Sequence, residues 1–391
     1  MNKSDVVFNC STNVIGGGIQ NSVNFISQVL KNKGYGLKWF FLLSPQVYEQ
    51  IKEILPQGSF FIAYDSPASS LLARNKIKKI VDSVSPKLVY TSAGPAYIKF
   101  SVPHIMGCSN PYILGASQYA YNLCGNKKEQ IKRKLKTAYQ RINIKKANVW
   151  IVQTESSKVQ LQNIVGKKSE IHIVYNSVSE DFLNFLNQRN IATDYVENLS
   201  SEPVCKILVP TAYYKHKDLE RVPVAAALLR KRYSGKFKIT FTVGSDTDYH
   251  NIVEIAKNHG VEDLIDNIGA YSHSQALSIY SKYDVVLQPS ALEVFSTSYI
   301  EAMSMLRPLV VPDFDFAKSI CGNYAYYYSA NDINSYVEAL YNAIHDMNLG
   351  ERYHKAVQIV RKYGSQEHRV NKIVALIKEY LVNNERQHVQ K

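Results

Sequence analysis

Short apolar segments alternate with longer stretches of helical periodicity along the chain. The apolar segments that predict strands include residues 5–10, 37–43, 87–92, 148–154, 171–176, 205–211, 238–244, 283–290 and 308–313. Helical spacing predicts helices between them, including residues 21–34, 218–233, 274–283 and 333–347. The strands are continuously apolar, as strands buried on both faces of a parallel sheet are. The alternation therefore predicts an α/β fold with parallel sheets wrapped by helices.

One polar stretch interrupts this alternation. Residues 186–203 lack strong periodicity and predict a linker between two α/β domains. The expected domains are residues 1–185 and 204–365, and 391 residues are enough for two full cores. Residues 366–391 are expected to form a C-terminal helix that packs back on the first domain and ends in a frayed tail.

Composition and charge narrow the class of protein. Hydrophobic residues make up 46% of the chain and charged residues 20%, as in globular proteins, and no apolar run is long enough for a transmembrane helix. Five scattered cysteines without a C-x-x-C pair favour a reducing cytoplasm. Residues 1–200 hold 24 Lys and Arg against 12 Asp and Glu, whereas residues 201–391 hold 22 against 21. The first half is therefore expected to meet a membrane surface, a nucleic acid or a phosphorylated substrate.

Three glycines, Gly16, Gly17 and Gly18, follow the first predicted strand and precede a helical stretch. Glycines there let backbone N–H groups approach a phosphate or a sugar, assisted by the helix dipole. The dinucleotide-binding fingerprint is absent because Asn21 takes its third glycine position, and no Walker sequence follows. A ligand contact and a tight structural turn are equal alternatives.

Two lysines, Lys215 and Lys217, flank His216 after the predicted strand at 205–211. Cations where a helix is expected to begin can neutralise a diphosphate without a metal ion. The alternative is a solvated basic loop.

Two acidic residues, Glu293 and Glu301, belong to the sequence PSALEVFSTSYIEAM at residues 289–303. A strand is predicted to end near Pro289 and a helix to begin near Thr297, so that backbone N–H groups form an anion site. Carboxylates accept hydrogen bonds from sugar hydroxyls. The pattern suits a ligand that is part phosphate and part polyol, and the alternative is two acids stabilised by the helix dipole.

The stretch from Glu293 to Met303 resembles the E-x7-E motif of retaining glycosyltransferases with the GT-B fold, especially glycosyltransferase family 4. The family pattern P-S-x-x-E-x-F-G-x-x-x-x-E-A-M, then G-x-P-V-V, is matched at Pro289, Ser290, Glu293, Phe295, Glu301, Ala302, Met303, Pro308 and Val310. Residues 243–290 resemble the family's segment that begins with its V-G-x-G turn, and residues 171–178 resemble the N-G-V turn. The resemblance implies two Rossmann-like doubly wound domains that face a cleft.

The resemblance also implies roles at the matched positions. Glu301 is expected to hold the nucleotide ribose, Glu293 to lie beside the donor sugar as a candidate catalytic residue, and Lys217 to compensate the diphosphate charge. The loop Gly16–Gly18 is expected to bind the acceptor in the first domain. The remaining donor-binding candidates are Gly244, Phe295, Ser296 and Thr297.

Some positions depart from the family pattern. The family's arginine, six residues before its lysine, is Thr211 here, which leaves Lys217, with Lys215 or Tyr214, to supply the charge at the donor site. Three other positions lack the family's glycine: Ser177, Ser296 and Leu306. These departures indicate a divergent branch.

Family members often have a histidine in the sugar site, at the end of a strand of the first domain. His104 is the candidate catalytic histidine, although the spacing leaves open whether His104 or Cys108 takes that position, and a structural histidine is the alternative. The D-x-D sequences at 246–248 and 313–315 are interpreted as loop acids, because three-residue matches are frequent by chance. No metal site and no cofactor is predicted.

A basic segment, residues 126–146, contains nine basic residues and one acidic residue. Its apolar residues at helical spacing are Ile131, Leu135, Ala138, Tyr139 and Ile142. The stripe favours a helix that packs on its own domain. The charge adds the alternative of a cationic surface near anionic lipid.

The preferred hypothesis is a retaining, metal-independent glycosyltransferase of the hexosyltransferase type that moves a sugar from a UDP- or GDP-sugar co-substrate to a hydroxyl group. The basic first half favours a lipid-linked precursor of a cell-surface polysaccharide as acceptor, and a peripheral position at the cytoplasmic face of an anionic membrane. The alternatives are a nucleotide-sugar epimerase of the same fold and a nucleic-acid-binding protein. No recognisable nucleic-acid module supports the last.

Overall fold

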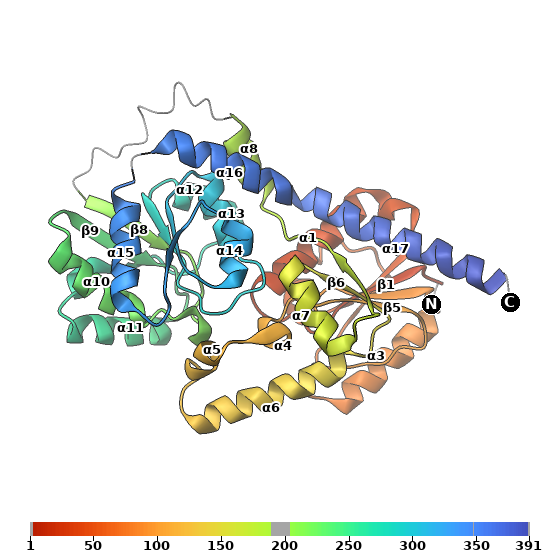
Figure 1. Cartoon of the computed structure of the whole chain (residues 1–391). Helices are drawn as coiled ribbons and strands as arrows, with labels where there is room; N and C mark the ends of the chain where they lie inside the picture. The colour runs from red at the N-terminus through yellow and green to blue at the C-terminus, as the bar shows by residue number, and fades with distance from the viewer. Residues whose placement is uncertain (1–2, 189–203, 347, 390–391) are drawn as a thin grey trace. The chain divides into compact units, whose positions relative to one another are not determined.

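Two compact units make up the chain in the computed structural model, which describes residues 3–188, 204–346 and 348–389 (Figure 1). The first unit contains residues 1–115, 131–175 and 366–391, and the second contains residues 116–130 and 176–365. Each unit has one parallel sheet with helices around it. The predicted α/β class with parallel sheets is confirmed.

The first unit is built on a seven-stranded sheet of order β3-β2-β1-β4-β5-β6-β7. Its strands are β1 (Val6–Cys10), β2 (Trp39–Leu43), β3 (Phe60–Ile62), β4 (Leu88–Thr91), β5 (His104–Gly107), β6 (Val149–Val152) and β7 (Glu170–Ile173). β1 pairs in parallel with β2 on one side and with β4 on the other. All residues of β1 are buried, as the continuous apolar pattern predicted.

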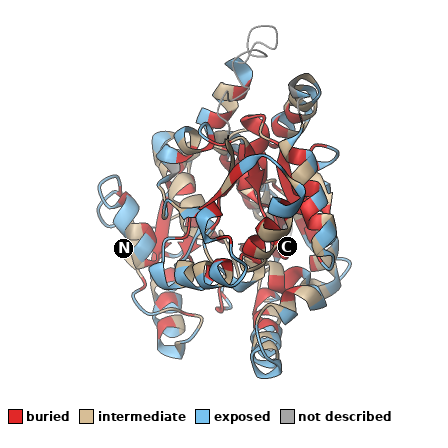
Figure 2. Ribbon diagram, turned by 90° about the vertical axis from the view of Figure 1, so that its left-hand side faces the viewer, coloured by how far each residue is buried: buried red, intermediate tan, exposed pale blue. Residues whose placement is uncertain are grey.

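Helices surround this sheet. Over the whole chain, Figure 2 shows buried residues concentrated on the strands and on the inner sides of the helices, with exposed residues on the outside. The helices are α1 (Gly17–Lys31), α2 (Pro45–Ile51), α3 (Leu71–Val84), α4 (Pro111–Gly115), α6 (Lys127–Ile144, from residue 131 onward), α7 (Glu155–Val165) and α17 (Gln366–Val389), with the 3-10 helix η1 (Lys33–Gly36). α1 buries Phe25, Ile26 and Val29, and the Phe25 ring stacks on Phe8 of β1 at 4.5 Å between centroids.

The last helix of the chain, α17, completes the core of the first unit. Val370, Ile373, Val374, Ile377 and Leu381 are buried in the same apolar cluster as β1 and α1. Their spacing of three and four residues places them on one face of the helix. The core of the first unit is therefore formed by residues from both the beginning and the end of the chain.

The second unit is built on a six-stranded sheet of order β10-β9-β8-β11-β12-β13. Its strands are β8 (Val204–Val209), β9 (Lys236–Phe241), β10 (Ile265–Asn267), β11 (Val285–Leu287), β12 (Leu309–Pro312) and β13 (Tyr326–Tyr328). Its helices are α5 (Gln118–Asn122), α8 (Glu180–Gln188), α10 (Arg221–Arg232), α11 (Asp246–Asn258), α12 (Ala276–Tyr280), α13 (Thr297–Ser304), α14 (Asp315–Cys321), α15 (Ile333–Ile344) and α16 (Leu349–Tyr363), with 3-10 helices η2 (Lys215–Lys217), η3 (Glu262–Leu264) and η4 (His273–Gln275). The Tyr328 and Tyr336 rings stack at 4.0 Å in its core.

The unit boundaries differ from the predicted domains in two places. Residues 176–188 belong to the second unit, and residues 186–188 end α8 instead of beginning a linker. Residues 116–130 also belong to the second unit, although they lie within the predicted first domain. The rest of the predicted linker, 189–203, lies outside the described residues. Polar composition alone did not reveal these crossings because the contacts that decide them are not local.

Candidate functional site

A topological switch point in the second sheet brings two loops together. β8 and β11 are neighbours, but the chain leaves β8 through α10 toward β9 on the opposite side. Parallel sheets bind ligands at the carboxyl ends of strands where the strand order reverses in this way. The loop after β8 leads into η2, and the loop after β11 leads into α13. The backbone N–H of Ala291 donates to the His216 carbonyl at 2.8 Å and joins the two loops.

An ion pair between Lys217 and Glu293 lies across this switch point. The Lys217 ammonium donates to Glu293 Oε1 in a short hydrogen bond, and the two side chains are 12% and 14% exposed. Lys217 is therefore not a solvated loop lysine, and the structure brings these two predicted site residues together. A partly buried lysine beside a carboxylate is a cation that an entering diphosphate can attract.

Every residue from 285 to 306 is buried except Glu293 and Thr297, which have intermediate exposure. Phe295 is buried with its ring edge-on to Tyr363 at 4.9 Å between centroids. This buried loop fixes the places where Glu293 and Thr297 reach the surface. We therefore assign the outer face of the predicted motif to these two side chains.

The amino end of α13 is organised by hydroxyl groups. Ser296 is the N-cap residue, but its Oγ lies 2.8 Å from Ser298 Oγ and makes no capping hydrogen bond. Gln288 Nε2 donates to Ser298 Oγ at 2.8 Å. Ser296 has a φ of −90°, which any residue adopts, so the glycine of the family pattern is not required there.

Glu301 lies in the second turn of α13 and is 8% exposed. Tyr280, at the end of α12, donates its hydroxyl to Glu301 Oε2 at 2.8 Å. Burial raises the pKa of Glu301 to about 7, and the hydrogen bond from Tyr280 lowers that pKa in part. The Glu301 carboxyl is therefore a buried hydrogen-bond acceptor, and the Tyr280 hydroxyl is a donor to it. The sequence offered no signal for Tyr280, which lies in an ordinary helical pattern.

The remaining candidates of the first loop do not join the ion pair. Lys215 Nζ contacts Glu220 Oε1 at 3.0 Å and the Tyr213 hydroxyl at 2.8 Å, and these contacts raise its pKa. The Tyr214 ring stacks on His216 at 5.6 Å. Thr211 is buried, and its Oγ1 donates to the Ala212 carbonyl at 3.3 Å. The ion pair with Glu220 argues against the expectation that Lys215 supplies charge beside Lys217, because Glu220 neutralises Lys215 in this arrangement.

Gly244 follows β9 and is a close-packed position. A Cβ atom there would lie 2.9 Å from the Ala270 Cβ, so only glycine fits without a shift. Asp246 and Asp248 lie in the first turn of α11, and Asp313 pairs with Lys318 at 3.1 Å. Asp246 and Asp248 therefore lie in a helix and not in a loop as interpreted, and of the second D-x-D sequence only Asp313 precedes its helix, which begins at Asp315.

A buried network holds the end of η2, and sequence reasoning missed it. Asp218 directly follows Lys217, is buried, and accepts hydrogen bonds from the Tyr119 hydroxyl at 2.6 Å and from Arg221 at 3.4 Å. Arg221 also donates to the Tyr119 hydroxyl and to the Ala330 carbonyl. Burial raises the pKa of Asp218 to about 6. Tyr119 comes from α5, 99 residues earlier in the chain, so no local pattern predicts the contact.

The first unit has its own switch point between β1 and β4, and the glycine loop follows β1 there. Gly16 is the N-cap of α1 with a φ of 60°, a conformation that favours glycine. Asn13 Nδ2 donates to Ser22 Oγ at 2.7 Å and to Ser92 Oγ at 2.8 Å, which ties the loop to the end of β4. Gly16 and Gly17 are exposed and Gly18 is partly exposed.

His104 is not at the place that the catalytic prediction required. It is the first residue of β5, is 1% exposed, and its Nε2 lies 2.8 Å from Thr91 Oγ1. Burial lowers its pKa to about 3, so the imidazole is neutral. Cys108 is the residue that follows the carboxyl end of β5, and it is also buried. The burial of His104 and its place at the start of β5 favour the structural alternative over the catalytic one.

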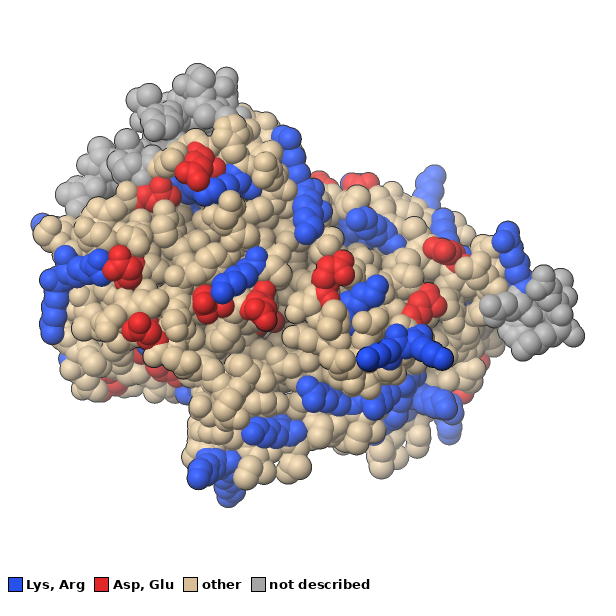
Figure 3. All heavy atoms as spheres, viewed as in Figure 1, with Lys and Arg blue, Asp and Glu red and all other residues tan. Residues whose placement is uncertain are grey.

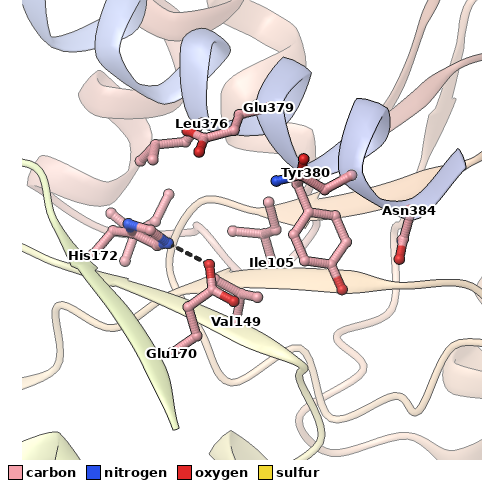
Figure 4. Close-up of a pocket in the computed structure, with 10 residues that line it drawn as sticks. Ile105, Val149, Glu170, His172, Leu376, Glu379, Tyr380 and Asn384 are labelled. Atoms are coloured by element: carbon pink, nitrogen blue, oxygen red, sulfur yellow. Dashed lines mark hydrogen bonds and ion pairs between the residues drawn. The ribbon is translucent and has the colours of Figure 1, made fainter. Parts of the chain in front are cut away.

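A separate pocket lies in the first unit under α17, against β5, β6 and β7 (Figure 4). Its lining includes Glu170, which accepts a hydrogen bond from His172 at 2.7 Å, and Tyr380 of α17. The pocket is on the covered face of the sheet and not among the loops at the carboxyl ends of the strands. We do not assign it to the candidate site.

Comparison with known proteins identifies the architecture. The chain is similar to sucrose-phosphate synthase from Thermosynechococcus elongatus, with a TM-score of 0.69 and 13% identity over 97% of this chain and 100% of that chain. The fold is GT-B. A GT-B structure of Anabaena HepE, in complex with UDP and glucose, gives a TM-score of 0.66 and 11% identity over 96% and 99% of the two chains. The lipopolysaccharide outer core galactosyltransferase WaaB, in its apo form, gives 0.62 and 15% over 94% and 98%.

Sequence comparison adds one family match. Residues 194–362 match the model of the family described as glycosyl transferases group 1. This segment of the GT-B fold includes Lys217, Glu293 and Glu301. No curated protein matches the chain in sequence.

Proposed function

We propose that this GT-B protein is a retaining glycosyltransferase, of family 4 by its E-x7-E motif, that uses a nucleotide diphosphate sugar. The observation that carries the proposal is the Lys217–Glu293 ion pair at the switch point. Glu293 lies in the loop that leads into α13, the helix that carries Glu301. The group 1 match over residues 194–362 supports it. The HepE structure, which holds UDP and glucose, supports a UDP-sugar as donor, with a GDP-sugar as the alternative.

In this proposal the diphosphate replaces Glu293 as the ion-pair partner of Lys217. The ammonium exchanges the Glu293 carboxylate for phosphate oxygens, and the first-turn N–H groups of α13 near Thr297 add donors to the same anion. Glu293 is then released to accept hydrogen bonds from the donor sugar. Glu301, buried beside Tyr280, accepts from the ribose hydroxyls.

Sugar transfer then needs no covalent nucleophile. The bond from the anomeric carbon to the diphosphate oxygen breaks, and its electron pair stays on the phosphate. The acceptor hydroxyl forms the new bond on the same face of the sugar and gives its proton to the departing phosphate. Lys217 and the amino end of α13 stabilise the charge that develops on the leaving group, so we propose that no metal ion is required.

The acceptor in this proposal is a lipid-linked saccharide, a precursor of a cell-surface polysaccharide, bound near Gly16–Gly18 of the first unit. The exposed glycine loop at the β1–β4 switch point supports this placement. Among the described residues, no helix is long and apolar enough to span a membrane. We propose that the protein works at the cytoplasmic face of the membrane as a peripheral protein.

Thermal unfolding in the presence of a panel of UDP- and GDP-sugars tests the donor site. The cognate donor stabilises the folded protein by mass action, so its transition temperature should rise above that with other nucleotides. Lys217→Met should abolish most of this rise. The matched change Lys215→Met should keep it, because Lys215 pairs with Glu220.

Two outcomes would contradict the proposal. The first is an equal rise for Lys217→Met and the unchanged protein. The second is release of free sugar from the donor at the same rate with and without a hydroxyl acceptor, which would favour the epimerase alternative.

A further inference from the structure

The helix α6 carries its apolar stripe on the outside. Ile131, Leu135 and Ile142 are 58%, 67% and 65% exposed, and Ala138 and Tyr139 are exposed as well. An amphipathic helix of a globular protein usually turns such a stripe toward the core. The prediction that the stripe packs on its own domain is therefore wrong for its aliphatic side chains, whereas Tyr139 stacks on Tyr97 of the first unit.

Mainly polar side chains of α6 face the protein instead. Thr137, Gln140, Asn143 and Ile144 are the buried residues of this helix. The Arg133 guanidinium stacks over the Tyr112 ring at 3.5 Å, and Arg141 Nε donates to the Ile113 carbonyl at 2.8 Å. These contacts with α4 set the rotation of α6 about its axis. The contacts of Arg133 and Arg141 with α4 therefore determine that the apolar stripe points outward.

Basic side chains border the stripe on both sides. At 100° per residue, Lys134 and Arg141 fall on one flank and Lys132 and Lys136 on the other. Figure 3 shows Lys and Arg side chains gathered over α6. A row of exposed aliphatic groups between two rows of cations is the pattern of helices that lie in a membrane interface.

The first turn of α3 extends this surface. Arg74 of α3 donates to the Tyr139 hydroxyl and lies over the Tyr139 ring, which places the two helices side by side. Leu71 and Leu72 at the start of α3 are 70% and 82% exposed. Lys76 and Lys78 on the same helix are exposed too. Exposed apolar and basic side chains therefore occur on both helices that this contact joins.

We propose that this surface, defined as the outward face of α6 from Ile131 to Ile142 with the first turn of α3, binds an anionic lipid bilayer. The aliphatic side chains enter the boundary between headgroups and acyl chains, and the flanking lysines contact anionic headgroups. The inferred role of this binding, to hold the enzyme beside a lipid-linked acceptor, rests on the proposed function. The binding itself does not. The inference specifies the surface and the mode of contact.

Charge and chemistry favour lipid over other occupants. A second copy packed on the same face by two-fold symmetry would place the basic flanks of one α6 against those of the other. A nucleic acid would contact the lysines but would leave Leu135 and Ile142 in water. An anionic bilayer satisfies the cations and the aliphatic groups at once.

Co-sedimentation with vesicles tests the surface. Vesicles of phosphatidylcholine and phosphatidylglycerol should bind the protein, vesicles of phosphatidylcholine alone should bind it weakly, and added salt should weaken the anionic binding. Lys132→Glu with Lys136→Glu should weaken binding at least roughly 25-fold, because each lost lysine alone is worth roughly fivefold. The matched change Lys167→Glu with Lys168→Glu, on exposed lysines between α7 and β7, should have a smaller effect.

A second pair of variants tests insertion. Leu135→Gln with Ile142→Gln should also weaken binding roughly tenfold, because two aliphatic side chains no longer leave water. The matched change Ile54→Gln with Val159→Gln, which alters exposed apolar residues outside α6 and α3, should leave binding unchanged. A tryptophan introduced as Leu135→Trp should be quenched by brominated lipid, and one introduced as Val159→Trp should not.

The proposal is overturned by equal binding to both vesicle types, by unaltered binding of the Leu135→Gln, Ile142→Gln variant, or by unquenched Leu135→Trp. A dimer in sedimentation velocity that this variant dissociates would assign the surface to a second copy instead. RNA binding lost in the Lys132→Glu, Lys136→Glu variant would assign it to a nucleic acid. The thermal shift with nucleotide sugars, measured on the same variants without lipid, reports separately on the proposed transferase function.

Discussion

At the scale of single residues, Leu306 combines two opposing features. Its φ of 57° lies in the left-handed region, where glycine is favoured and a leucine is strained. The side chain is buried nevertheless. The family pattern has glycine at this position, so the backbone conformation gives a physical reason for that glycine, and burial stabilises the leucine that replaces it.

We expect Leu306→Ala to destabilise the second unit more than Leu306→Gly. Both changes remove a buried leucine, which costs about 2–5 kcal/mol, but only glycine also relieves the positive φ, by about 1 kcal/mol. Urea unfolding of the two variants measures the difference. An alanine variant as stable as the glycine variant would show that the backbone at Leu306 is not strained.

Glu301 should make the stability of the second unit depend on pH. Its pKa is raised in the folded state, from the model-peptide value of 4.5 to about 7, so the folded state binds more protons than the unfolded state between these values. Stability from this group is therefore lost as pH rises from about 4.5 to 7. We expect Glu301→Gln to gain stability relative to the unchanged protein when both are compared at pH 8 instead of pH 5. A constant difference across this range would contradict the burial of an ionisable carboxyl.

At the scale of elements, η2 depends on α5 for its position. The Tyr119 hydroxyl contacts both Asp218 and Arg221, and Asp218 directly follows the site lysine. η2 is a single 3-10 turn of three residues, and 3-10 hydrogen bonds have poorer geometry than those of an α-helix, so its own backbone hydrogen bonds constrain Lys217 only weakly. The buried network supplies the missing constraint on Lys217.

Removal of the Tyr119 hydroxyl should destabilise the second unit. Tyr119→Phe leaves the buried Asp218 carboxyl with only the longer hydrogen bond from Arg221, and the loss of the Tyr119 donor costs about 1–3 kcal/mol. The hydrogen bond from Tyr119 favours ionised Asp218, whose pKa is about 6, so the loss should be greater at pH 8 than at pH 5. Thermal unfolding at the two pH values measures it, with exposed Tyr64→Phe as the control. Equal losses at both pH values would argue against an ionised Asp218.

The helix α17 should contribute core stability to the first unit. Ile377 is fully buried against the cluster that contains β1 and α1. Ile377→Ala should cost about 2–5 kcal/mol, because the deletion leaves a cavity. The neighbouring Lys378→Ala, on the exposed face, should be nearly neutral. Hydrogen exchange of β1 amides reports on the first unit alone, and unchanged protection in the Ile377→Ala variant would show that α17 is not part of that core.

At the scale of the whole molecule, the chain passes between the units more than once. The first unit takes three segments of the chain and the second takes two. A single cut in the polar stretch 186–203 therefore does not separate two complete domains. This organisation differs from a pair of consecutive domains joined by one linker.

A fragment that ends at residue 185 should not fold stably. It lacks α17, whose buried stripe completes the first core, and it carries residues 116–130, which belong to the second unit. We expect weak near-ultraviolet circular dichroism and strong binding of a hydrophobic dye. Addition of a peptide that covers residues 366–389 should restore part of the signal. A cooperative unfolding transition in the fragment alone would contradict the expected role of α17.

Local patterns of the sequence determined the order of strands and helices and the position of the loops that follow the strands. Continuous apolar segments are buried wherever they lie in a parallel sheet, so they predict strands without knowledge of their neighbours. The positions of Lys217, Glu293 and the glycine loop at strand ends followed from the same pattern. The same pattern did not predict that His104 is buried. His104 is the first residue of β5 and not the residue after its end, and the pattern left the start of that strand undetermined.

The tertiary structure alone decided which side chains meet. Lys217 and Glu293 are 76 residues apart, Tyr119 and Asp218 are 99 apart, and Tyr280 and Glu301 are 21 apart. The packing of α4 against Arg133 and Arg141 likewise turned the apolar stripe of α6 outward. Periodicity shows that a helix has two unlike faces, but it does not show which face the rest of the protein covers. That choice depends on the shape and polarity of distant segments, which only the folded chain brings together.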